Sequence, residues 1–340
     1  MSDQHSDVGH GHGHSHPHDH EHDSARRRTV RNRLGHVLRP HSHDAADSID
    51  DALESSAKGI RAVKISLVAL AATSLVQLVV VLASGSVALL ADTIHNFSDA
   101  LTALPLWLAF AVGRRAPTRR YTYGYGRAED LAGLFVVAMI AVSAVVAGYE
   151  SIARLIDPRP VEHLGWVAFA GAVGFLGNEA VAIFRIRVGH QIGSAALVAD
   201  GLHARTDGLT SLAVVLGAAG VAAGWELADP IVGLLITVAI LAVLRTALRD
   251  IFRRLMDAVD PALVDTAESS LKGIPGVVAV RRVRMRWIGH EIHADADLDI
   301  ESSTSLAEAH RLAHAAEHQL THAVPKLSGA VVHAYPTALE

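Results

Sequence analysis

The sequence of 340 residues contains no cysteine. This absence excludes disulfide bonds, iron–sulfur clusters and thiolate zinc sites, and it leaves nitrogen and oxygen ligands for any bound metal. Charged residues are also scarce, at 19% of the chain against about 25% in an ordinary soluble protein. The formal net charge is −5, so the chain lacks the basic balance of a nucleic-acid-binding protein and we expect no nucleic-acid partner. The first 30 residues have no apolar core, so we expect no secretory signal peptide.

Histidine, in contrast, is abundant. Eleven of the 22 histidines lie in the first 43 residues: His5, His10, His12, His14, His16, His18, His20, His22, His36, His41 and His43. Most alternate with Gly, Ser, Pro and acidic residues, a composition that cannot bury a core and predicts a disordered tail over residues 1–57. Such tracts are typical of weak, multivalent metal capture. The alternative, a cloning tag, is usually a run of consecutive histidines.

Six apolar stretches follow the tail. Residues 65–83 and 131–149 are each free of charge, and at 1.5 Å per residue each nearly crosses a bilayer core of about 30 Å. Four further stretches carry embedded polar residues: 86–112, 164–184, 192–223 and 231–244. A soluble helical core can imitate one or two such stretches but hardly six, so we predict a membrane domain of six transmembrane helices over residues 58–256.

Basic residues in the short loops indicate the orientation. They gather before the first stretch, between the second and third, between the fourth and fifth, and after the sixth: Arg61, Lys64, Arg114, Arg115, Arg119, Arg120, Arg127, Arg185, Arg187, Arg249, Arg253 and Arg254. All these loops fall on one side, which predicts cytoplasmic N- and C-termini. From residue 257 the composition becomes that of a soluble domain. A helix, two strands, a helix and a strand are expected, which favours a small α+β domain with an antiparallel sheet over residues 257–340.

Two of the stretches carry the same polar motif, A-D-x-x-H-x-x-x-D, at residues 91–99 and 199–207. The histidine and the second aspartate are four residues apart, so on a helix they share one face. Two such helices facing each other supply two nitrogen and two oxygen donors, a tetrahedral set that suits Zn²⁺. The predicted metal ligands are His95, Asp99, His203 and Asp207.

The burial of these carboxylates needs an explanation. Burying each carboxylate in mid-membrane costs at least about 2.5–3.5 kcal/mol. Residues that only hold helices together would not need the same spacing in two helices, so the repeated motif favours a shared site. The first aspartates, Asp92 and Asp200, are either a shell that holds the ligand histidine or stops on an ion path. Asn178 either lines the site or packs between helices, and for Arg205 we expect packing or a salt bridge.

At these residues, and in four further stretches, the chain is similar to the cation diffusion facilitator family. Residues 85–92 (GSVALLAD) resemble the family's entry into its second helix, and residues 123–129 (YGYGRAE) resemble the signature before its third. Residues 229–233 (DPIVG) and 332–336 (VHAYP) resemble the start of the sixth helix and the closing strand. The resemblance extends from residue 60 to residue 337.

The resemblance implies a homodimer in the lipid membrane that exports divalent metal ions from the cytoplasm in exchange for protons. It implies the four-residue site named above, which in this family usually belongs to zinc transporters. It also implies a cytoplasmic ferredoxin-like C-terminal domain. No cofactor is expected besides the transported Zn²⁺ and H⁺, and no enzymatic activity.

Two departures from the family affect its other metal sites. Where some members have ligands between the second and third helices, this chain has Thr118, Tyr121 and Tyr125, so that site is predicted absent. In the C-terminal domain Asp297, His310 and His333 match ligand positions, whereas Arg281 and Tyr335 replace ligands. A complete binuclear regulatory site is therefore not expected. His310, His314 and His318 share a helix face, either as further ligands or as a solvated face.

Metal binding requires neutral imidazole and ionised carboxylate, so protons compete with metal for the site. This competition predicts antiport, with His95 and His203 as the proton carriers. Co²⁺, Ni²⁺, Fe²⁺ and Cd²⁺ are alternatives to Zn²⁺. The other classes left open are an intramembrane metalloenzyme and a membrane metal sensor. The composition and the lack of targeting signals favour the inner membrane of a bacterium.

Overall fold

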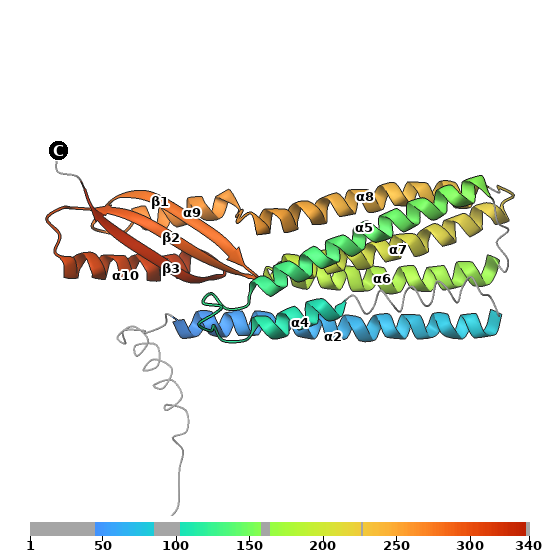
Figure 1. The fold of residues 1–340 in the computed structure, drawn as a ribbon, viewed down its shortest axis with the longest axis horizontal. Coiled ribbons are helices and arrows are strands. Elements are labelled where there is room, and N and C mark those ends of the chain that lie inside the picture. Colours follow the sequence, from blue (N-terminus) through green and yellow to red (C-terminus); the bar gives the residue numbers. More distant parts are fainter. Residues whose placement is uncertain (1–44, 85–102, 158–163, 226, 338–340) are drawn as a thin grey trace, which may run out of the picture. The chain divides into compact units, whose positions relative to one another are not determined.

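The computed structural model describes residues 45–84, 103–157, 164–225 and 227–337 (Figure 1). The chain divides into a unit Met1–His43, which lies outside these ranges, and a second unit, Asp44–Glu340. Every element named below belongs to the second unit. The His-rich tail as far as residue 44 is among the predictions that fall outside the described residues.

The membrane domain is built from long helices. In the described ranges these are α2 (Ala45–Ser84), α4 (Ala103–Gly113), α5 (Arg127–Ile156), α6 (Leu164–Ile192), α7 (Ala195–Ala222) and α8 (Ala228–Leu255). Among the described residues, four helices are long and apolar enough to cross a membrane, namely Leu53–Leu82 within α2, α5, α6 and α8. The fifth predicted span is α7, whose charged residues set it apart. Only α4 is described of the second predicted span.

Helix α2 begins earlier than the sequence analysis predicts. It runs without a break from Ala45 across residue 57, the expected end of the disordered tail. Residues 45–57 include four alanines, Ala45, Ala46, Ala52 and Ala57, and Ala has the highest helix propensity. The ion pair between Glu54 and Lys58, at i and i+4, adds support of the usual helical kind.

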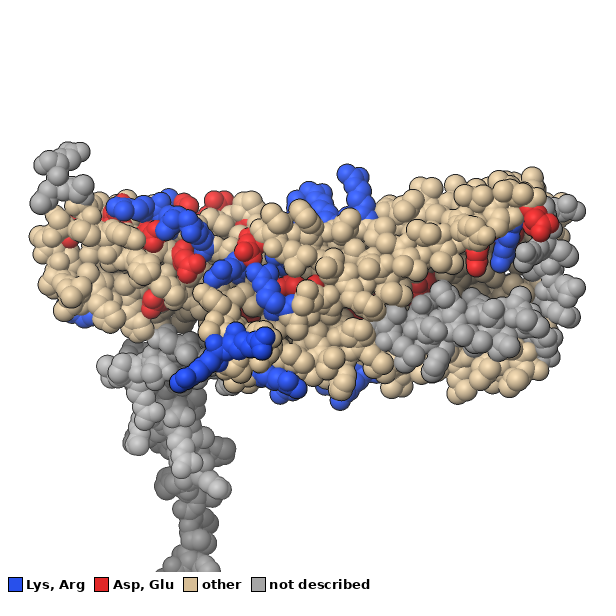
Figure 2. Space-filling model, in the orientation of Figure 1, with Lys and Arg blue, Asp and Glu red and all other residues tan. Residues whose placement is uncertain are grey.

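The long helices bury some polar side chains and leave many large apolar side chains exposed. Leu82, Val145 and Leu235 are all largely exposed, whereas Gln77 is buried and its Nε2 donates to the carbonyl of Ala170, which joins α2 to α6 at 3.3 Å. On the face shown in Figure 2, Lys, Arg, Asp and Glu are sparse over the long helices and gather at their ends and over the C-terminal domain. Such an exterior suits a hydrocarbon solvent.

Helices α6 and α7 form a tight hairpin. Gly193, with φ of +78°, ends α6, and the Ser194 hydroxyl caps α7 by accepting from Leu197 N at 3.1 Å. Gly201 brings the two backbones together, because a Cβ there would lie 3.0 Å from Ile186 N. Helix α7 also contacts α5 and α8, which leaves its polar residues surrounded by protein.

The C-terminal domain consists of α9 (Pro261–Lys272), β1 (Val277–Ile288), β2 (Glu291–Ile300), α10 (Leu306–Ala323) and β3 (Leu327–Pro336). Its sheet has the order β1-β2-β3. The core contains Leu271, Ile292, Leu298 and Leu320, which pack the two helices against one face of the sheet. The expected helix–strand–strand–helix–strand order is confirmed.

The expected antiparallel sheet, however, is wrong in part. Strands β1 and β2 are antiparallel, joined by a two-residue turn, but β2 and β3 are parallel. The reason is α10, which runs back along the sheet so that β3 starts at the same end as β2. The domain therefore has a small mixed sheet.

Candidate metal transport site

Helix α7 presents the predicted histidine and aspartate of the second motif as a buried pair. His203 is 1% exposed and Asp207 is 5% exposed. Their nearest ring nitrogen and carboxylate oxygen, Nδ1 and Oδ1, are 3.8 Å apart. The i, i+4 spacing thus brings one imidazole and one carboxylate to the same side of the helix, as predicted.

The other half of the predicted site lies outside the described residues. His95, Asp99 and Asp92 all fall in the range 85–102, so their placement beside α7 remains a prediction. The described helix that follows them, α4, belongs to the same predicted span and contacts α7. This contact is compatible with a second ligand pair near the first.

The first aspartate of the motif, Asp200, has a partner on the neighbouring helix. Arg185 of α6 places Nη1 at 2.9 Å from Asp200 Oδ2, and the two side chains are 2% and 0% exposed. The carboxylate charge of Asp200 is therefore balanced by a guanidinium. Sequence reasoning missed this role because Arg185 was interpreted as part of a basic loop. Its position inside the last turns of an apolar helix was the available signal.

A second ion pair joins the same two helices. Arg205 donates from Nη2 and Nε to the two oxygens of Glu179, at 2.7 and 3.1 Å. This confirms the salt bridge that was one alternative for Arg205. Asn178, the neighbour of Glu179, is buried, and its Cβ would be 3.4 Å from a Cβ at Gly208. Asn178 thus packs against α7 one residue beyond Asp207.

The two pairs run in opposite directions between α6 and α7. Helix α6 contributes Glu179 and Arg185, and helix α7 contributes Arg205 and Asp200. On α7 they lie on either side of His203 along the sequence. Two of the charges in the motif region are thereby neutralised by α6, and the hairpin is fixed where it carries His203 and Asp207.

The candidate regulatory ligands of the C-terminal domain are only partly brought together. Asp297 of β2 and His333 of β3 are register partners on neighbouring strands. His310 lies exposed on α10, a helix that packs against the sheet. Asp297 is also ion-paired with Arg282. Within the described part of the chain, no three His, Asp or Glu side chains form a cluster that could hold a metal ion.

Arg281 and Tyr335, which the resemblance places at ligand positions of other family members, contact each other. The guanidinium of Arg281 lies 4.6 Å from the centre of the Tyr335 ring and donates to Asp299 Oδ1 at 2.6 Å. A cation stacked on an aromatic ring occupies this place, and the absence of a complete binuclear site stays a prediction. Thr118 and Tyr121, at the predicted absent site, form a local turn in which Tyr121 N donates to Thr118 Oγ1.

Two titratable groups of the C-terminal domain have displaced pKa values. Burial lowers the pKa of His293 on β2, whose Nε2 is 3.2 Å from Ser328 Oγ. Burial, and next the charge of Arg254, lowers the pKa of Lys326 in the turn before β3. Its Nζ donates to the carbonyl of His190 near the end of α6, at 3.4 Å. Both groups favour the neutral form more than their exposed counterparts.

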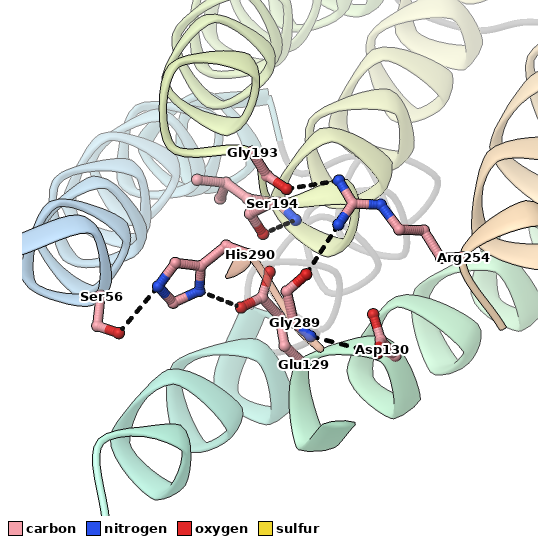
Figure 3. Close-up of polar contacts among 9 residues, drawn as sticks. Ser56, Glu129, Asp130, Gly193, Ser194, Arg254, Gly289 and His290 are labelled. Carbon is pink, nitrogen blue, oxygen red and sulfur yellow. Dashed lines mark hydrogen bonds and ion pairs between the residues drawn. The ribbon is translucent and has the colours of Figure 1, made fainter. Parts of the chain in front are cut away.

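A polar cluster that sequence reasoning missed lies where the C-terminal domain meets the helices (Figure 3). Glu129 and Asp130 in the first turn of α5 are buried and face the β1–β2 turn, Gly289-His290. The signal was the acidic pair Glu129-Asp130, which begins at the last residue of the signature at residues 123–129. A buried acidic pair at a helix start needs partners, and a sequence alone does not say which residues supply them.

Comparison with known proteins agrees with the membrane and C-terminal domains. Residues 63–256 match the cation efflux transmembrane domain, and residues 259–337 match the cation efflux protein, cytoplasmic domain. A probable cation efflux system protein of Mycobacterium tuberculosis is 69% identical over 92% of this chain and 95% of its own length.

More distant relatives span several lineages. The manganese efflux system protein MneS of Bacillus subtilis is 24% identical over 77% of this chain and 91% of its own length. The magnetosome protein MamB of Paramagnetospirillum magneticum is 25% identical over 72% of this chain and 83% of its own length. A solved structure of the C-terminal domain of MamM is 21% identical over 22% of this chain and 96% of that chain, with a TM-score of 0.22. The domain matches and the 69% identity show that the chain belongs to the cation diffusion facilitator family of cation efflux transporters.

Proposed function

We propose that this member of the family exports Zn²⁺ from the cytoplasm in exchange for protons. The observation that carries the proposal is the buried pair on α7, in which His203 Nδ1 and Asp207 Oδ1 lie 3.8 Å apart inside a bundle of membrane helices. The repetition of the motif at His95 and Asp99 supplies the other two ligands. Together they form an N₂O₂ set that suits tetrahedral Zn²⁺.

Proton coupling follows from the chemistry of the ligands. Metal binds neutral imidazole and ionised carboxylate, so each bound proton opposes metal binding. Metal loads from the cytoplasm onto the four ligands, the helices rearrange, and protons from the other side displace it. His95 and His203 are the proposed proton carriers, because histidine titrates nearest to working pH.

The two ion pairs between α6 and α7 support a site that moves as a unit. Four membrane charges are matched in two pairs, so the hairpin can tilt without exposing an unmatched charge to lipid. The proposed proton and metal chemistry is then left to the four ligands. No catalytic step is needed in this scheme, so we do not assign an enzymatic activity.

The choice of metal rests on the donor set. Imidazole suits Zn²⁺, Co²⁺, Ni²⁺ and Fe²⁺, whereas Mn²⁺ favours sites built only from oxygen. The relative in Bacillus subtilis is named for manganese efflux, which makes Mn²⁺ a necessary comparison. The alternative transported metals, for a protein of the same fold and site, are Co²⁺, Ni²⁺, Fe²⁺ and Cd²⁺.

The proposed setting is a homodimer in the inner membrane of a bacterium, with both termini in the cytoplasm. The basic loops carry the orientation, and the match to the family's cytoplasmic domain supports pairing of subunits through residues 259–337. The His-rich segment at the N-terminus would then raise the metal concentration near the cytoplasmic entrance.

The test is metal flux into liposomes under a pH gradient. We expect Zn²⁺ flux that depends on the gradient and falls at least about tenfold in Asp207→Ala, because one of four ligands is lost. Asp265→Ala, at an exposed position of α9, is the matched control and should transport as the wild type does. Flux of Co²⁺ or Mn²⁺ without Zn²⁺ would overturn the choice of metal. Zn²⁺ binding without flux of any ion would favour a metal sensor.

A further inference from the structure

The turn between β1 and β2 reaches out of the C-terminal domain to the membrane helices. Ile288 pairs with Glu291, so Gly289 and His290 form a two-residue turn, with φ of +65° at Gly289. A Cβ at Gly289 would lie 2.8 Å from the carbonyl oxygen of Gly126. Both the conformation and the close approach to the start of α5 therefore require glycine at this position.

His290 connects this turn to two helices. Its Nδ1 is 2.8 Å from Glu129 Oε2 on α5, and its Nε2 is 3.4 Å from Ser56 Oγ on α2. The backbone N–H of Gly289 points to Asp130 Oδ2 at 3.5 Å. Figure 3 shows these groups converging on the turn from both helices.

Arg254, near the end of α8, connects the same turn to the α6–α7 hairpin. It donates from Nη1 to the carbonyl of Gly289 at 2.8 Å and from Nη2 to the carbonyl of Gly193 at 2.6 Å. Its guanidinium also stacks on Trp287 of β1, 3.8 Å from the ring centre. Figure 3 shows Arg254 between the β1–β2 turn and the corner from which α7 starts. Through Trp287 the same side chain also contacts β1.

The contact between Arg254 and Gly193 matters because Gly193 lies just before the start of α7. Gly193 is followed by Ser194, the cap of α7, and α7 is one continuous helix to Ala222. A continuous helix that moves as a rigid body would carry a displacement of this corner to His203 and Asp207. Lys326, from the turn before β3, donates to the carbonyl of His190, which lies on α6 shortly before Gly193. The C-terminal domain therefore also contacts this corner directly.

We propose that the β1–β2 turn keeps its contacts with α2, α5 and α8 throughout transport and so acts as a fixed joint. Arg254 is the positioning residue that connects this joint to α7. In this role Arg254 touches neither metal nor ligand, and it sets the placement of the helix that carries them. The joint acts on helix movement, so its tests use whichever divalent cation the wild type carries, with Zn²⁺ as the first probe.

The first test separates positioning from metal binding. In Arg254→Gln we expect the maximal flux per metal-binding site to fall about tenfold, because two charge-assisted hydrogen bonds are lost. The metal KM should stay within about twofold, since no ligand is changed. Arg254→Lys keeps the charge but cannot reach both carbonyls, so its flux should be intermediate. Arg253→Gln, exposed on the same helix, is the matched control.

The second test asks whether Arg254 acts through the turn. Trp287→Leu removes the stacking partner in the C-terminal domain. If the joint is one unit, adding Arg254→Gln to Trp287→Leu should lower flux no further than the stronger single variant does. Falls that multiply would mean that Arg254 acts elsewhere and would overturn the proposal. A large rise in KM in Arg254→Gln would do the same.

A backbone variant keeps the proposal testable if Arg254→Gln does not fold. Gly289→Ala adds a Cβ against Gly126 in a strained conformation. Gly224→Ala is the matched control, because φ is +87° there and a Cβ would meet nothing within 4 Å. Only Gly289→Ala should lower maximal flux. Equal effects would show that backbone strain alone is responsible.

Because the chain has no cysteine, cross-linking can test directly whether the β1–β2 turn keeps its contact with α2 during transport. In the variant Ser56→Cys/His290→Cys the two thiolates should each displace methanesulfinate from a short bis-methanethiosulfonate, which links them through two disulfides that a reductant cleaves. The linked protein should transport as well as the same variant before linking. Flux that is lost on linking and returns on cleavage would overturn the proposal, as would a failure to link. A wild type that carries no divalent cation refutes the proposed function instead. In that case the extent of cross-linking would still test the joint. So would the comparison of Arg254→Gln, Trp287→Leu and the double variant, with melting temperature measured in place of flux.

Discussion

Replacing Arg185 should destabilise the membrane domain strongly, because its partner Asp200 would be left charged and buried. The side chains are 2% and 0% exposed and the closest nitrogen and oxygen are 2.9 Å apart. At an effective dielectric constant of about 20 the attraction over this distance is about 6 kcal/mol. Desolvation offsets much of it, and removing one partner of such a pair typically costs about 3–5 kcal/mol.

The loss should appear in thermal unfolding of the purified protein in detergent. With about 2–4 °C per kcal/mol for a chain of this order of size, Arg185→Met should lower the melting temperature by about 10 °C. The double variant Arg185→Met/Asp200→Leu leaves no charge unpaired and should recover most of the loss. Arg187→Met, two residues further along α6, is the control and should melt near the wild type.

The reasoning would be refuted by either of two results. A drop of less than about 2 °C in Arg185→Met would correspond to under about 1 kcal/mol and would mean that Asp200 is not held by this arginine. A double variant no more stable than the single one would mean that lost packing, and not an unpaired carboxylate, causes the loss.

Three further outcomes are expected. Gly201→Ala should lower the melting temperature and the flux, because its Cβ would meet Ile186 at 2.7 Å and overpacking costs about 1–3 kcal/mol; Gly165→Ala, with nothing within 4 Å, should be silent in both assays. Burial lowers the pKa of His293, so the unfolded chain takes up its proton first, and the C-terminal domain should lose stability as pH falls through about 6.5, the ordinary histidine value. His293→Gln should flatten this pH dependence in chemical denaturation, and an unchanged slope would contradict the assignment. Glu179→Gln should weaken the bidentate pair with Arg205 and lower the melting temperature by less than Arg185→Met does, because this pair is partly exposed. An equal or larger drop would contradict the idea that burial of the pair sets the cost of losing one partner.

The elements of the membrane domain were predictable because hydrophobic length is a local property. The stretches at 131–149 and 164–184 lie within α5 and α6, and the i, i+4 rule placed His203 beside Asp207. The extent of the helices was less predictable. α5 starts at Arg127 and α8 ends at Leu255, because both helices continue past the apolar run into charged turns whose side chains contact the β1–β2 turn.

Pairings between distant residues were not predictable from one sequence. Arg185 was counted among basic loop residues, yet it lies buried against Asp200. Glu129 was part of a signature, yet its partner is His290, 161 residues away. The parallel register of β2 and β3 depends on the path of α10, which periodicity does not encode.

Transport was implied by the resemblance to the cation diffusion facilitator family, whereas the residues by themselves determined a membrane protein with two repeated His-Asp motifs, a soluble C-terminal domain and no thiol chemistry. These properties follow from composition, from the length of apolar runs and from the spacing of residues on one helix, all of which are local. Only the tertiary structure decided that Asp200 is matched by Arg185 and that Arg254 bridges the β1–β2 turn and Gly193, two residues before the start of α7. Such contacts depend on which helix faces meet in space, and the close approach at Gly201 and Gly289 is a property of two backbones at once.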